Sequence, residues 1–395
     1  MGVFFKWAGI LWSRFGLTDG TWRSSSAFSG IGCPEIASSA IWAVARRGVF
    51  CFQFGIERDH MARSVMATHS PHCMLQDDIL DWIPNHLRMR LAKASAGALR
   101  SMIFDEDVRL TMTCTGGVTY DFGDCHIAGP PCVDFSPMGV GRCESGPSMI
   151  CLYIWARAVL EARPMLLIIE NVPRFPVDLL RSLFGSVYHV ESTILEAYAF
   201  GSPGRRRRMY AVLTLRGKLR LRRSLAELPM EVQGLFAARR SWESLFCLPG
   251  SDDGFSQAVS KRAIEYVRVF KDKQSIYDLD QLPRGRPRRA CAGAPLFGLT
   301  AHTRHCWSHR FGRSLRRAEL GASMGIPTHP ALSYIYGMQH ISFESFSRSA
   351  AARLIGNGMS VPCVGSVMMW CSAYAAPDIT RIPMRVPLDN DATDS

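Results

Sequence analysis

Strand-like and helix-like segments alternate through the first two hundred residues, and this alternation constrains the fold more than any other feature. The expected strands are short apolar runs at residues 49–56, 122–128, 165–169 and 209–215. Expected helices lie between strands, at residues 34–47 and 149–162. Because strands that alternate with helices build parallel sheets covered on both faces, we predict an α/β fold with a doubly wound, mostly parallel sheet.

The composition is that of a globular protein with a positive net charge. Of 395 residues, 47% are hydrophobic and 20% are charged, which excludes a disordered chain and allows one large domain with a smaller companion. The chain carries 46 Lys and Arg against 34 Asp and Glu, for a net charge of +12. This excess favours a polyanionic partner such as nucleic acid.

Cysteine spacing and hydropathy bear on the compartment. The thirteen cysteines include no Cys-x-x-Cys pair, which favours a reducing intracellular compartment over a disulfide framework. We therefore expect the nucleus if the source is eukaryotic and the cytoplasm otherwise. Residues 355–377 carry no charge, but Gly, Pro and small polar residues interrupt the run, so we expect a buried helix and no membrane partner.

One cysteine and one carboxylate are placed where catalytic groups are expected. Cys132 follows Gly129, Pro130 and Pro131, in a stiff loop directly after the strand expected at 122–128. Glu170 ends the strand expected at 165–169. The carboxyl ends of parallel strands meet at one sheet edge, so the thiol and the carboxylate are expected to share that edge. A deprotonated thiol is a nucleophile, and a nearby carboxyl group transfers protons.

A glycine turn and two acids form a candidate nucleotide site. The run from Phe28 through Gly30 to Gly32 lies between an expected strand and helix, where glycines let the backbone approach a ligand closely. Glu57 ends the next strand, where an acid can bind both hydroxyls of a ribose. Asp78 follows, where an acid can accept a hydrogen bond from an adenine amine.

Two arginine runs are candidate contacts to a substrate. Arg206 and Arg208 come just before an expected strand, and alternate residues of an extended chain point to the same side. The run at 282–289 resembles an AT-hook core that lies along an A·T minor groove, although a basic loop touching phosphates is the alternative; its arginines are Arg284, Arg286, Arg288 and Arg289. The histidines near Cys306 lack a second ligand pair, so we predict no metal site.

Taken in order, these motifs resemble those of the cytosine-5 DNA methyltransferases. The resemblance covers roughly residues 22–215 and 296–376, including Gly356 and Asn357. It implies a Rossmann-like sheet that binds S-adenosylmethionine and a smaller target-recognition domain that binds double-stranded DNA. The implied cofactor-binding residues are Phe28, Gly30, Gly32, Glu57, Asp78, Pro131 and Asn357.

The same resemblance implies roles for the catalytic residues. Cys132 would add to carbon 6 of a flipped-out cytosine, and Glu170 would hydrogen-bond the ring as the thiol adds. Arg208 would hold the carbonyl oxygen of the base, and Arg206 would support the catalytic loop. We therefore expect a monomeric DNA (cytosine-5)-methyltransferase.

The predicted organisation has five parts. The βαβ rhythm ends near Arg216, where basic runs begin to mix with short apolar pieces. The predicted limits are an N-terminal extension at 1–21, a catalytic domain at 22–215 with an insertion at about 85–117, a smaller DNA target-recognition domain at 216–295, a return segment at 296–376 and a tail at 377–395.

The sequence departs from the family pattern in ways that leave two alternatives open. Val133 and Gly204 stand where the family usually has glutamine, and the strand expected before Phe28 is polar. One alternative is the branch of the family that methylates transfer RNA, against which the AT-hook-like run favours DNA. The other is a non-catalytic DNA-binding protein that keeps the fold, against which the presence of both Cys132 and Glu170 argues.

Overall fold

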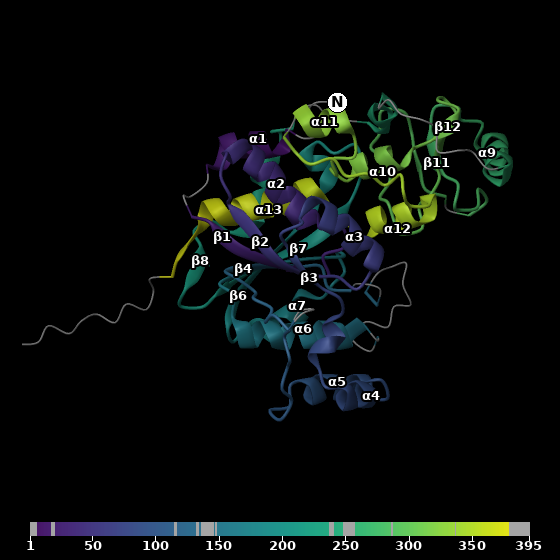
Figure 1. Ribbon diagram of the computed structural model, residues 1–395. Helices are drawn as coiled ribbons and strands as arrows, with labels where there is room; N and C mark the ends of the chain where they lie inside the picture. Colours follow the sequence, from purple (N-terminus) through teal and green to yellow (C-terminus); the bar gives the residue numbers. More distant parts are fainter. Residues whose placement is uncertain are drawn as a thin grey trace, which may run out of the picture.

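The computed structural model describes residues 6–16, 20–113, 117–131, 134–135, 146, 148–236, 241–247, 257–285, 287–335 and 337–378. Its centre is a seven-stranded sheet (Figure 1). The strands in spatial order are β3 (Met74–Gln76), β2 (Phe50–Ile56), β1 (Trp22–Ala27), β4 (Cys125–Ala128), β5 (Leu166–Asn171), β7 (Arg207–Leu215) and β6 (Tyr188–Glu196). The pairs from β3 through β5 are parallel, and β7 is antiparallel to both β5 and β6. The predicted doubly wound, mostly parallel sheet is therefore confirmed.

The strand order places the ligand-binding edge. From β1 the chain moves outward through β2 to β3, and then it returns to place β4 on the other side of β1. In open α/β sheets, a crevice forms outside the carboxyl ends of the strands where the order reverses in this way. The carboxyl ends of β1 and β4 are therefore the expected place for a ligand.

Helices cover both faces of the sheet (Figure 1). Side chains of four helices share a core with one face: α1 (Trp7–Phe15), α2 (Cys33–Ala45), α3 (His60–His69) and α13 (Val361–Tyr374). The opposite face is covered by α6 (Ser148–Ala162) and α7 (Val177–Phe184), with α4 (Asn85–Leu91) and α5 (Ala96–Ile103) below α6. The helices predicted at 34–47 and 149–162 correspond to α2 and α6. The edge strand β6 was not predicted, because most of its side chains are only partly buried and its polar residues weaken the strand pattern.

The predicted insertion is folded onto the rest of the protein. Leu87, Leu91 and Leu99 are buried in the core that includes α6. Arg157 of α6 donates hydrogen bonds to the carbonyl oxygens of Ile103, Asp105 and Val108, at 2.5, 2.6 and 2.5 Å. These bonds attach the end of α5 and the segment after it to the helix layer.

The polar first strand is satisfied by internal hydrogen bonds. Ser25 Oγ donates to the Phe122 carbonyl oxygen at 2.7 Å and lies 2.7 Å from His126 Nδ1. Trp155 Nε1 donates to His126 Nε2, so Nδ1 carries the proton of the neutral ring and donates to Ser25. Burial lowers the pKa of His126 to about 3, which agrees with a neutral ring. The serines therefore stabilise the centre of the sheet instead of exposing it.

The uncharged run near the C-terminus forms a core helix. Residues 348–374 are long and apolar enough to cross a membrane, but 94% of the most apolar window is buried inside the protein. Residues 348–374 comprise α12 (Arg348–Asn357) and α13, which are separated by three residues. The predicted buried helix corresponds to α13, which packs against α1 and α2.

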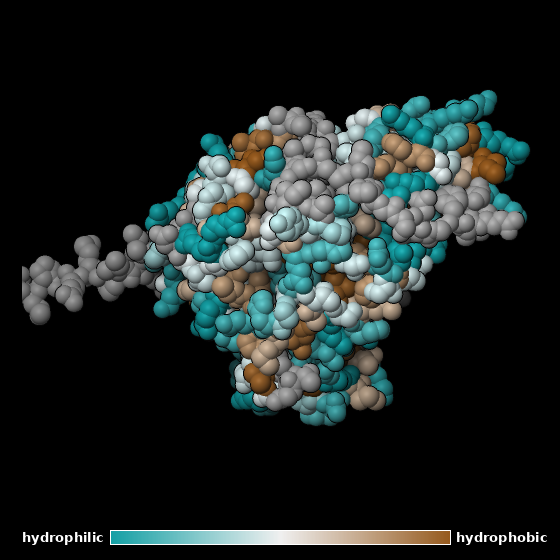
Figure 2. Space-filling model, turned by 45° about the horizontal axis from the view of Figure 1, so that its top comes forward, coloured by the Kyte–Doolittle hydropathy of each residue, from teal (hydrophilic) through white to brown (hydrophobic). Residues whose placement is uncertain are grey.

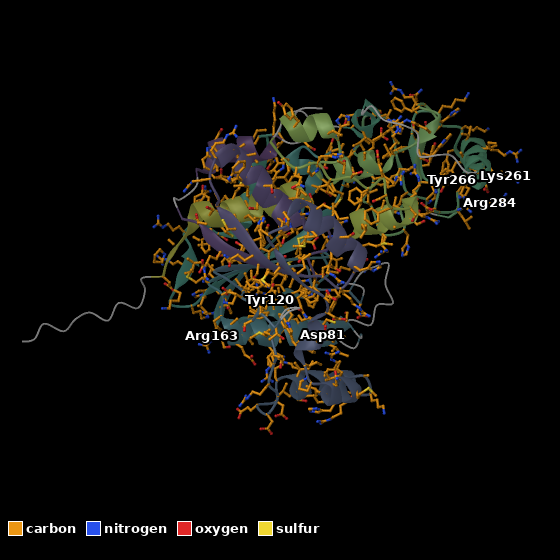
Figure 3. All side chains as sticks on the ribbon, in the orientation of Figure 1. Asp81, Tyr120, Arg163, Lys261, Tyr266 and Arg284 are labelled. Atoms are coloured by element: carbon orange, nitrogen blue, oxygen red, sulfur yellow. The ribbon has the colours of Figure 1, made fainter. Side chains whose placement is uncertain are left out.

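A second, smaller sheet lies at the opposite end of the molecule from α4 and α5 (Figure 1). Its strands in spatial order are β10 (Arg289–Ala290), β9 (Ile276–Asp278), β11 (Cys306–Ser308) and β12 (Arg313–Ser314). Tyr266 of α9 (Gln257–Phe270) is buried against Tyr277 and Trp307 of this sheet. Lys261, Tyr266 and Arg284 all lie in this small unit (Figure 3). The visible surface there is mainly hydrophilic, with hydrophobic side chains in small separate groups (Figure 2).

The small sheet does not follow the predicted segment limits. β8 (Leu219–Leu221) pairs with β13 (Ala375–Pro377), and α8 (Leu228–Val232) packs on β6, so residues 219–232 lie against the large sheet. The small sheet in turn continues to Ser314, past the limit predicted at residue 295. Nothing in the sequence around β8 indicates that it pairs with β13, about 150 residues later. The predicted domain limits stay a prediction, because membership of a sheet does not by itself define an independent unit.

Candidate active site

Residues predicted to form the site come together at the carboxyl edge of the large sheet. Phe28 follows β1, Glu57 follows β2 and Asp78 comes two residues after β3. Pro131 comes three residues after β4, and Glu170 lies near the end of β5. Cys132, Val133 and Arg286 lie outside the described residues.

The glycine turn after β1 has the backbone conformation that glycine favours. Gly30 and Gly32 have φ angles of 56° and 79°. A Cβ on Gly32 would lie 2.8 Å from His69 Cε1, so no larger residue fits there without movement. A Cβ on Gly30 would meet nothing within 4 Å among the described residues. The turn therefore leaves open space beside Gly30 at the start of α2.

Glu57 is tied to this turn. Its Oε2 accepts a hydrogen bond from Gly30 N at 2.7 Å, and its Oε1 accepts one from Asp59 N at 2.8 Å. Burial raises the pKa of Glu57, while the Gly30 hydrogen bond and the charges of Arg63 and Arg353 oppose that rise. The structure thus fixes a carboxylate beside the open side of the glycine turn.

Asp78 has a local structural role, as the cap of a short helix. Its Oδ1 accepts a hydrogen bond from Leu80 N at 3.0 Å and caps the short helix η1 (Ile79–Trp82). Its Oδ2 lies 3.4 Å from Arg58 Nε. The predicted contact with an adenine amine stays a prediction.

Glu170 and Arg208 form an ion pair at the same edge. Glu170 Oε1 lies 3.1 Å from Arg208 Nε, and the two side chains are 11% and 22% exposed. The contact lacks the alignment of a hydrogen bond, and the buried Oε1 accepts no hydrogen bond from any described residue. A buried carboxylate oxygen in this state keeps lone pairs that can accept a hydrogen bond.

Asn171 joins this carboxylate to the Pro-Pro loop. Its Nδ2 donates a hydrogen bond to the Pro130 carbonyl oxygen at 3.2 Å, and its Oδ1 accepts one from Val172 N at 2.9 Å. The loop that leads to Cys132 is thereby fixed to the end of β5. Asn171 was not among the predicted site residues, although its position directly after Glu170 was a signal for it.

Arg206 connects the return segment to β7. Its guanidinium donates to the carbonyl oxygens of Gly356 at 3.1 Å, Gly358 at 2.5 Å and Leu299 at 3.4 Å. The side chain is buried, and burial lowers its pKa to about 10. Arg206 and Arg208 point inward while Arg205 and Arg207 are exposed, as the alternation predicted. Arg206 thus holds the end of α12 beside the site. Asn357, the last residue of α12, is exposed.

The arginines of the 282–289 run divide into two kinds. Arg284 and Arg289 are exposed, and Arg289 Cζ lies 5.3 Å from the centre of the Phe270 ring. Arg288 instead pairs with the buried Asp278 and donates to the Gly298 carbonyl oxygen at 2.6 Å. Because these contacts hold the small sheet together, Arg288 is not available in the way an AT-hook arginine must be. Among the described residues, no cluster of His, Cys, Asp and Glu could hold a metal ion.

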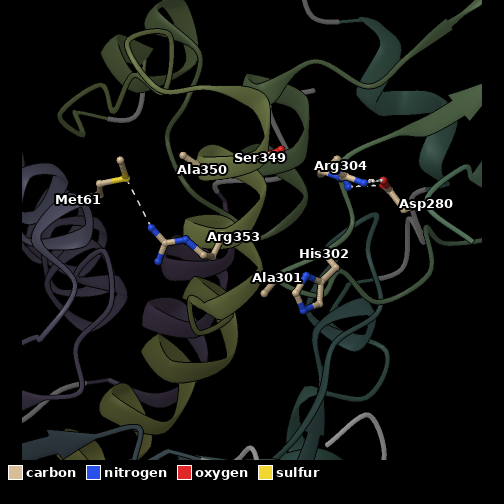
Figure 4. Close-up of a pocket in the computed structure, with 8 residues that line it drawn as sticks. All are labelled: Met61, Asp280, Ala301, His302, Arg304, Ser349, Ala350 and Arg353. Carbon is tan, nitrogen blue, oxygen red and sulfur yellow. Dashed lines mark hydrogen bonds and ion pairs between the residues drawn. The ribbon is translucent and has the colours of Figure 1, made fainter. Parts of the chain in front are cut away.

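A cleft that the sequence did not predict lies between the large and small units (Figure 4). Its volume is about 550 Å³. One wall comes from α3 and α12, and the other from residues 280 and 301–304. The lining residues are Met61, Asp280, Ala301, His302, Arg304, Ser349, Ala350 and Arg353.

Known proteins resemble this chain in sequence and in fold. The C-5 cytosine-specific DNA methylase family matches residues 119–233. The Type II methyltransferase M1.HgaI of Avibacterium volantium is 30% identical over 114 residues, which cover 24% of this chain and 32% of that protein. The chain thus spans about a third of the length of the curated relative it matches.

Solved structures share the fold at low sequence identity. The Dnmt2 methyltransferase of S. pombe has a TM-score of 0.55 at 13% identity, with 89% of this chain and 98% of that chain covered. A putative DNA modification methyltransferase encoded within an E. coli prophage has a TM-score of 0.53 at 14% identity, with the same coverage. At these identities the likeness shows the fold alone.

The sequence match and the fold agree with the motif order. The match at 119–233 begins just before β4 and includes Glu170, Arg206 and Arg208, while the structural matches extend over most of the chain. Families of this kind generally use S-adenosylmethionine. These findings support the cytosine-5 DNA methyltransferase family, with the sequence match carried by residues 119–233.

Proposed function

We propose that this chain is a DNA (cytosine-5)-methyltransferase that acts through a covalent bond between Cys132 and carbon 6 of a flipped-out cytosine. The observation that carries the proposal is the buried ion pair of Glu170 and Arg208 at the sheet edge, in which Glu170 Oε1 accepts no hydrogen bond from any described residue. A cytosine presents a ring nitrogen and an exocyclic amine on one side and a carbonyl oxygen nearby. A carboxyl group and an arginine side by side match that donor and acceptor pattern.

The proposed chemistry assigns one step to each group. The Cys132 thiolate forms a bond to carbon 6, and the Glu170 carboxyl, in its protonated form, donates its proton in a hydrogen bond to ring nitrogen 3 as electron density moves into the ring. Carbon 5 becomes nucleophilic and takes the methyl group, which bound S-adenosylmethionine supplies. A water molecule or another base then takes the proton from carbon 5, which expels the thiolate and restores the ring. Arg208 holds the base carbonyl oxygen throughout.

Cofactor binding is supported by the geometry after β1 and β2. The Gly30 turn leaves room for a ligand, and Glu57 is fixed beside it through the Gly30 N–H. An acid at this position can accept hydrogen bonds from ribose hydroxyls on its remaining lone pairs. Asn357 lies at the end of α12, which Arg206 fixes in place.

DNA is the proposed substrate because of the charge and the family. The net charge of +12 and the exposed Arg284 and Arg289 favour a polyanion. The matched family and the E. coli prophage protein are described by name as acting on DNA.

The test uses labelled S-adenosylmethionine with duplex DNA or transfer RNA. We expect label on DNA, and a covalent adduct with DNA that contains 5-fluorocytosine. Cys132→Ser should abolish both, whereas Cys51→Ser, which alters an exposed cysteine on β2, should abolish neither. Label on transfer RNA alone would overturn the DNA assignment, and no label on either would favour a non-catalytic protein.

A further inference from the structure

Arg353 and Asp59 join two walls of the candidate cofactor site. Arg353 lies on α12, four residues before Asn357. Asp59 caps the start of α3, two residues after Glu57. The Arg353 guanidinium pairs with Asp59 Oδ2, although the residues are 294 positions apart in the chain. The large unit therefore carries an ion pair between the helix that ends at Asn357 and the loop that holds Glu57.

Hydrogen bonds continue from this ion pair to the glycine turn. Asp59 N donates to Glu57 Oε1 at 2.8 Å, and Glu57 Oε2 accepts from Gly30 N at 2.7 Å. The other carboxylate oxygen of Asp59 accepts from Met61 N at 3.0 Å. An unbroken series of contacts thus runs from Arg353 to the residue beside the open space at Gly30.

The placement of Arg353 on its helix matters. Residues four apart lie on the same face of a helix, so Arg353 and Asn357 share one face of α12. Arg353 Nη2 also lies 3.5 Å from Met61 Sδ of α3 (Figure 4). Arg206 donates to the carbonyl oxygens of Gly356 and Gly358, at and just after the end of α12. The end of α12 is therefore fixed toward β7 by Arg206 and toward α3 by Arg353.

Charge gives the pair a second effect. The positive charge of Arg353 lowers the pKa of Glu57 and so opposes the effect of burial. An ionised carboxylate is the better acceptor for ribose hydroxyls. Removal of Arg353 should therefore raise the pKa of Glu57 and also change the spacing between α12 and the loop that holds Glu57.

We infer that Arg353 and Asp59 are positioning residues for cofactor binding, which hold Glu57 and Asn357 at the spacing that the cofactor needs. This inference rests on the proposed cofactor site. The pair does not contact the reacting atoms, so it acts on cofactor affinity and leaves the methyl-transfer step to the catalytic groups.

Calorimetric binding of S-adenosylhomocysteine to the full chain tests the inference. Arg353→Gln and Asp59→Asn should each weaken binding about tenfold, a change that matches the interaction energies of contacting pairs. Arg353→Lys should recover part of the loss, because the charge returns without the second guanidinium nitrogen. The double variant Asp59→Asn with Arg353→Gln should bind no more weakly than the weaker single variant, because both remove the same interaction.

Two further readouts separate positioning from general destabilisation. The turnover number at saturating cofactor should change less than about twofold in Arg353→Gln, because only binding is affected. The acid limb of binding should move to higher pH, since the pKa of Glu57 rises when the cation is lost. Arg14→Gln breaks a different long-range ion pair, with Glu231 at 2.5 Å, and should leave binding unchanged.

The outcomes distinguish this inference from the proposed function. If Glu57→Gln binds S-adenosylhomocysteine as the unmodified protein does, the cofactor site itself is misassigned. If Glu57→Gln weakens binding while a folded Arg353→Gln does not, the site stands and the positioning role is overturned. Additive losses in the double variant would also overturn it.

Discussion

Arg208 reaches Glu170 diagonally across the antiparallel junction of β5 and β7. Tyr210 is the residue directly opposite Glu170, and Arg208 lies two positions away on the same face of β7. A long side chain spans such a diagonal, and its Nε lies 3.1 Å from Glu170 Oε1. The antiparallel β7 thus brings an arginine from the start of one strand to a carboxylate at the end of another.

Replacing Glu170 with Gln should lower kcat/KM by about 10²- to 10⁴-fold, because an amide of the same shape cannot donate or accept a proton in the proposed way. Steady-state methylation assays measure the change. Glu161→Gln is the matched control, since Glu161 pairs with Arg157 on α6, away from the site. Activity of Glu170→Gln within about twofold of the unmodified protein would contradict the assigned role.

Replacing Arg206 with Met should destabilise the protein by about 3 kcal/mol or more, because three carbonyl oxygens lose their buried donor. Chemical denaturation measures the free energy of unfolding. Binding of S-adenosylhomocysteine should also weaken, since the end of α12 is released. The neighbouring Arg205 is exposed, so Arg205→Met should change stability by less than about 0.5 kcal/mol. Equal effects of the two variants would show that the carbonyl contacts do not matter.

Replacing Gly365 with Ala should destabilise the protein by about 1–3 kcal/mol, although alanine favours helices. A Cβ on Gly365 of α13 would lie 2.0 Å from Cη2 of the buried Trp7, so α1 must move. The midpoint of chemical denaturation reports the loss. At Gly97 of α5 a Cβ meets no described atom within 4 Å, so Gly97→Ala should be neutral or stabilise by up to about 1 kcal/mol. A stable Gly365→Ala variant would mean that α1 does not pack as described.

Glu35 should make stability depend on pH. Burial raises its pKa from 4.5 to about 7, so its contribution to stability is fully present below pH 4.5 and is lost as the pH rises through 7. Relative to the unmodified protein, Glu35→Gln should gain about 3 kcal/mol between pH 4.5 and 7.5, because glutamine cannot ionise. Unfolding free energies at several pH values give this difference.

The contribution of His126 to stability depends on pH in the opposite direction, and His126 is present in both proteins of that comparison. Its pKa is lowered to about 3, so its contribution is present above pH 6.5 and is lost as the pH falls toward 3. Because both proteins contain His126, this contribution cancels in the difference between them. A difference that does not vary with pH would show that Glu35 does not titrate as burial predicts.

Much of the fold and of the site edge was predictable from local patterns. The apolar runs gave β2, β4, β5 and β7, because burial on both faces of a parallel sheet requires nearly continuous apolar residues. The positions of Glu57 and Glu170 at strand ends followed from the same runs. The opposite exposures of Arg205 and Arg206 followed from the alternation of an extended chain.

Local patterns give less information where a side chain is fixed by a partner distant in sequence. Arg288 reads as one member of a basic run, but it pairs with Asp278 and holds the small sheet. The polar strand β1 shows little apolar alternation. Its buried serines are stabilised by hydrogen bonds with Glu35, His126 and the Phe122 carbonyl oxygen. No local pattern indicates which buried polar groups will meet.

The sequence by itself determined most of the strand and helix order and the sheet edge at which Glu57 and Glu170 lie. Only the tertiary structure decided that Asn171 ties the Pro-Pro loop to β5, that Arg206 holds the end of α12, and that Arg353 pairs with Asp59. The physical reason is the range of the forces involved. Burial and backbone periodicity act on each short segment, whereas an ion pair or a buried hydrogen bond exists only after folding brings its two partners together.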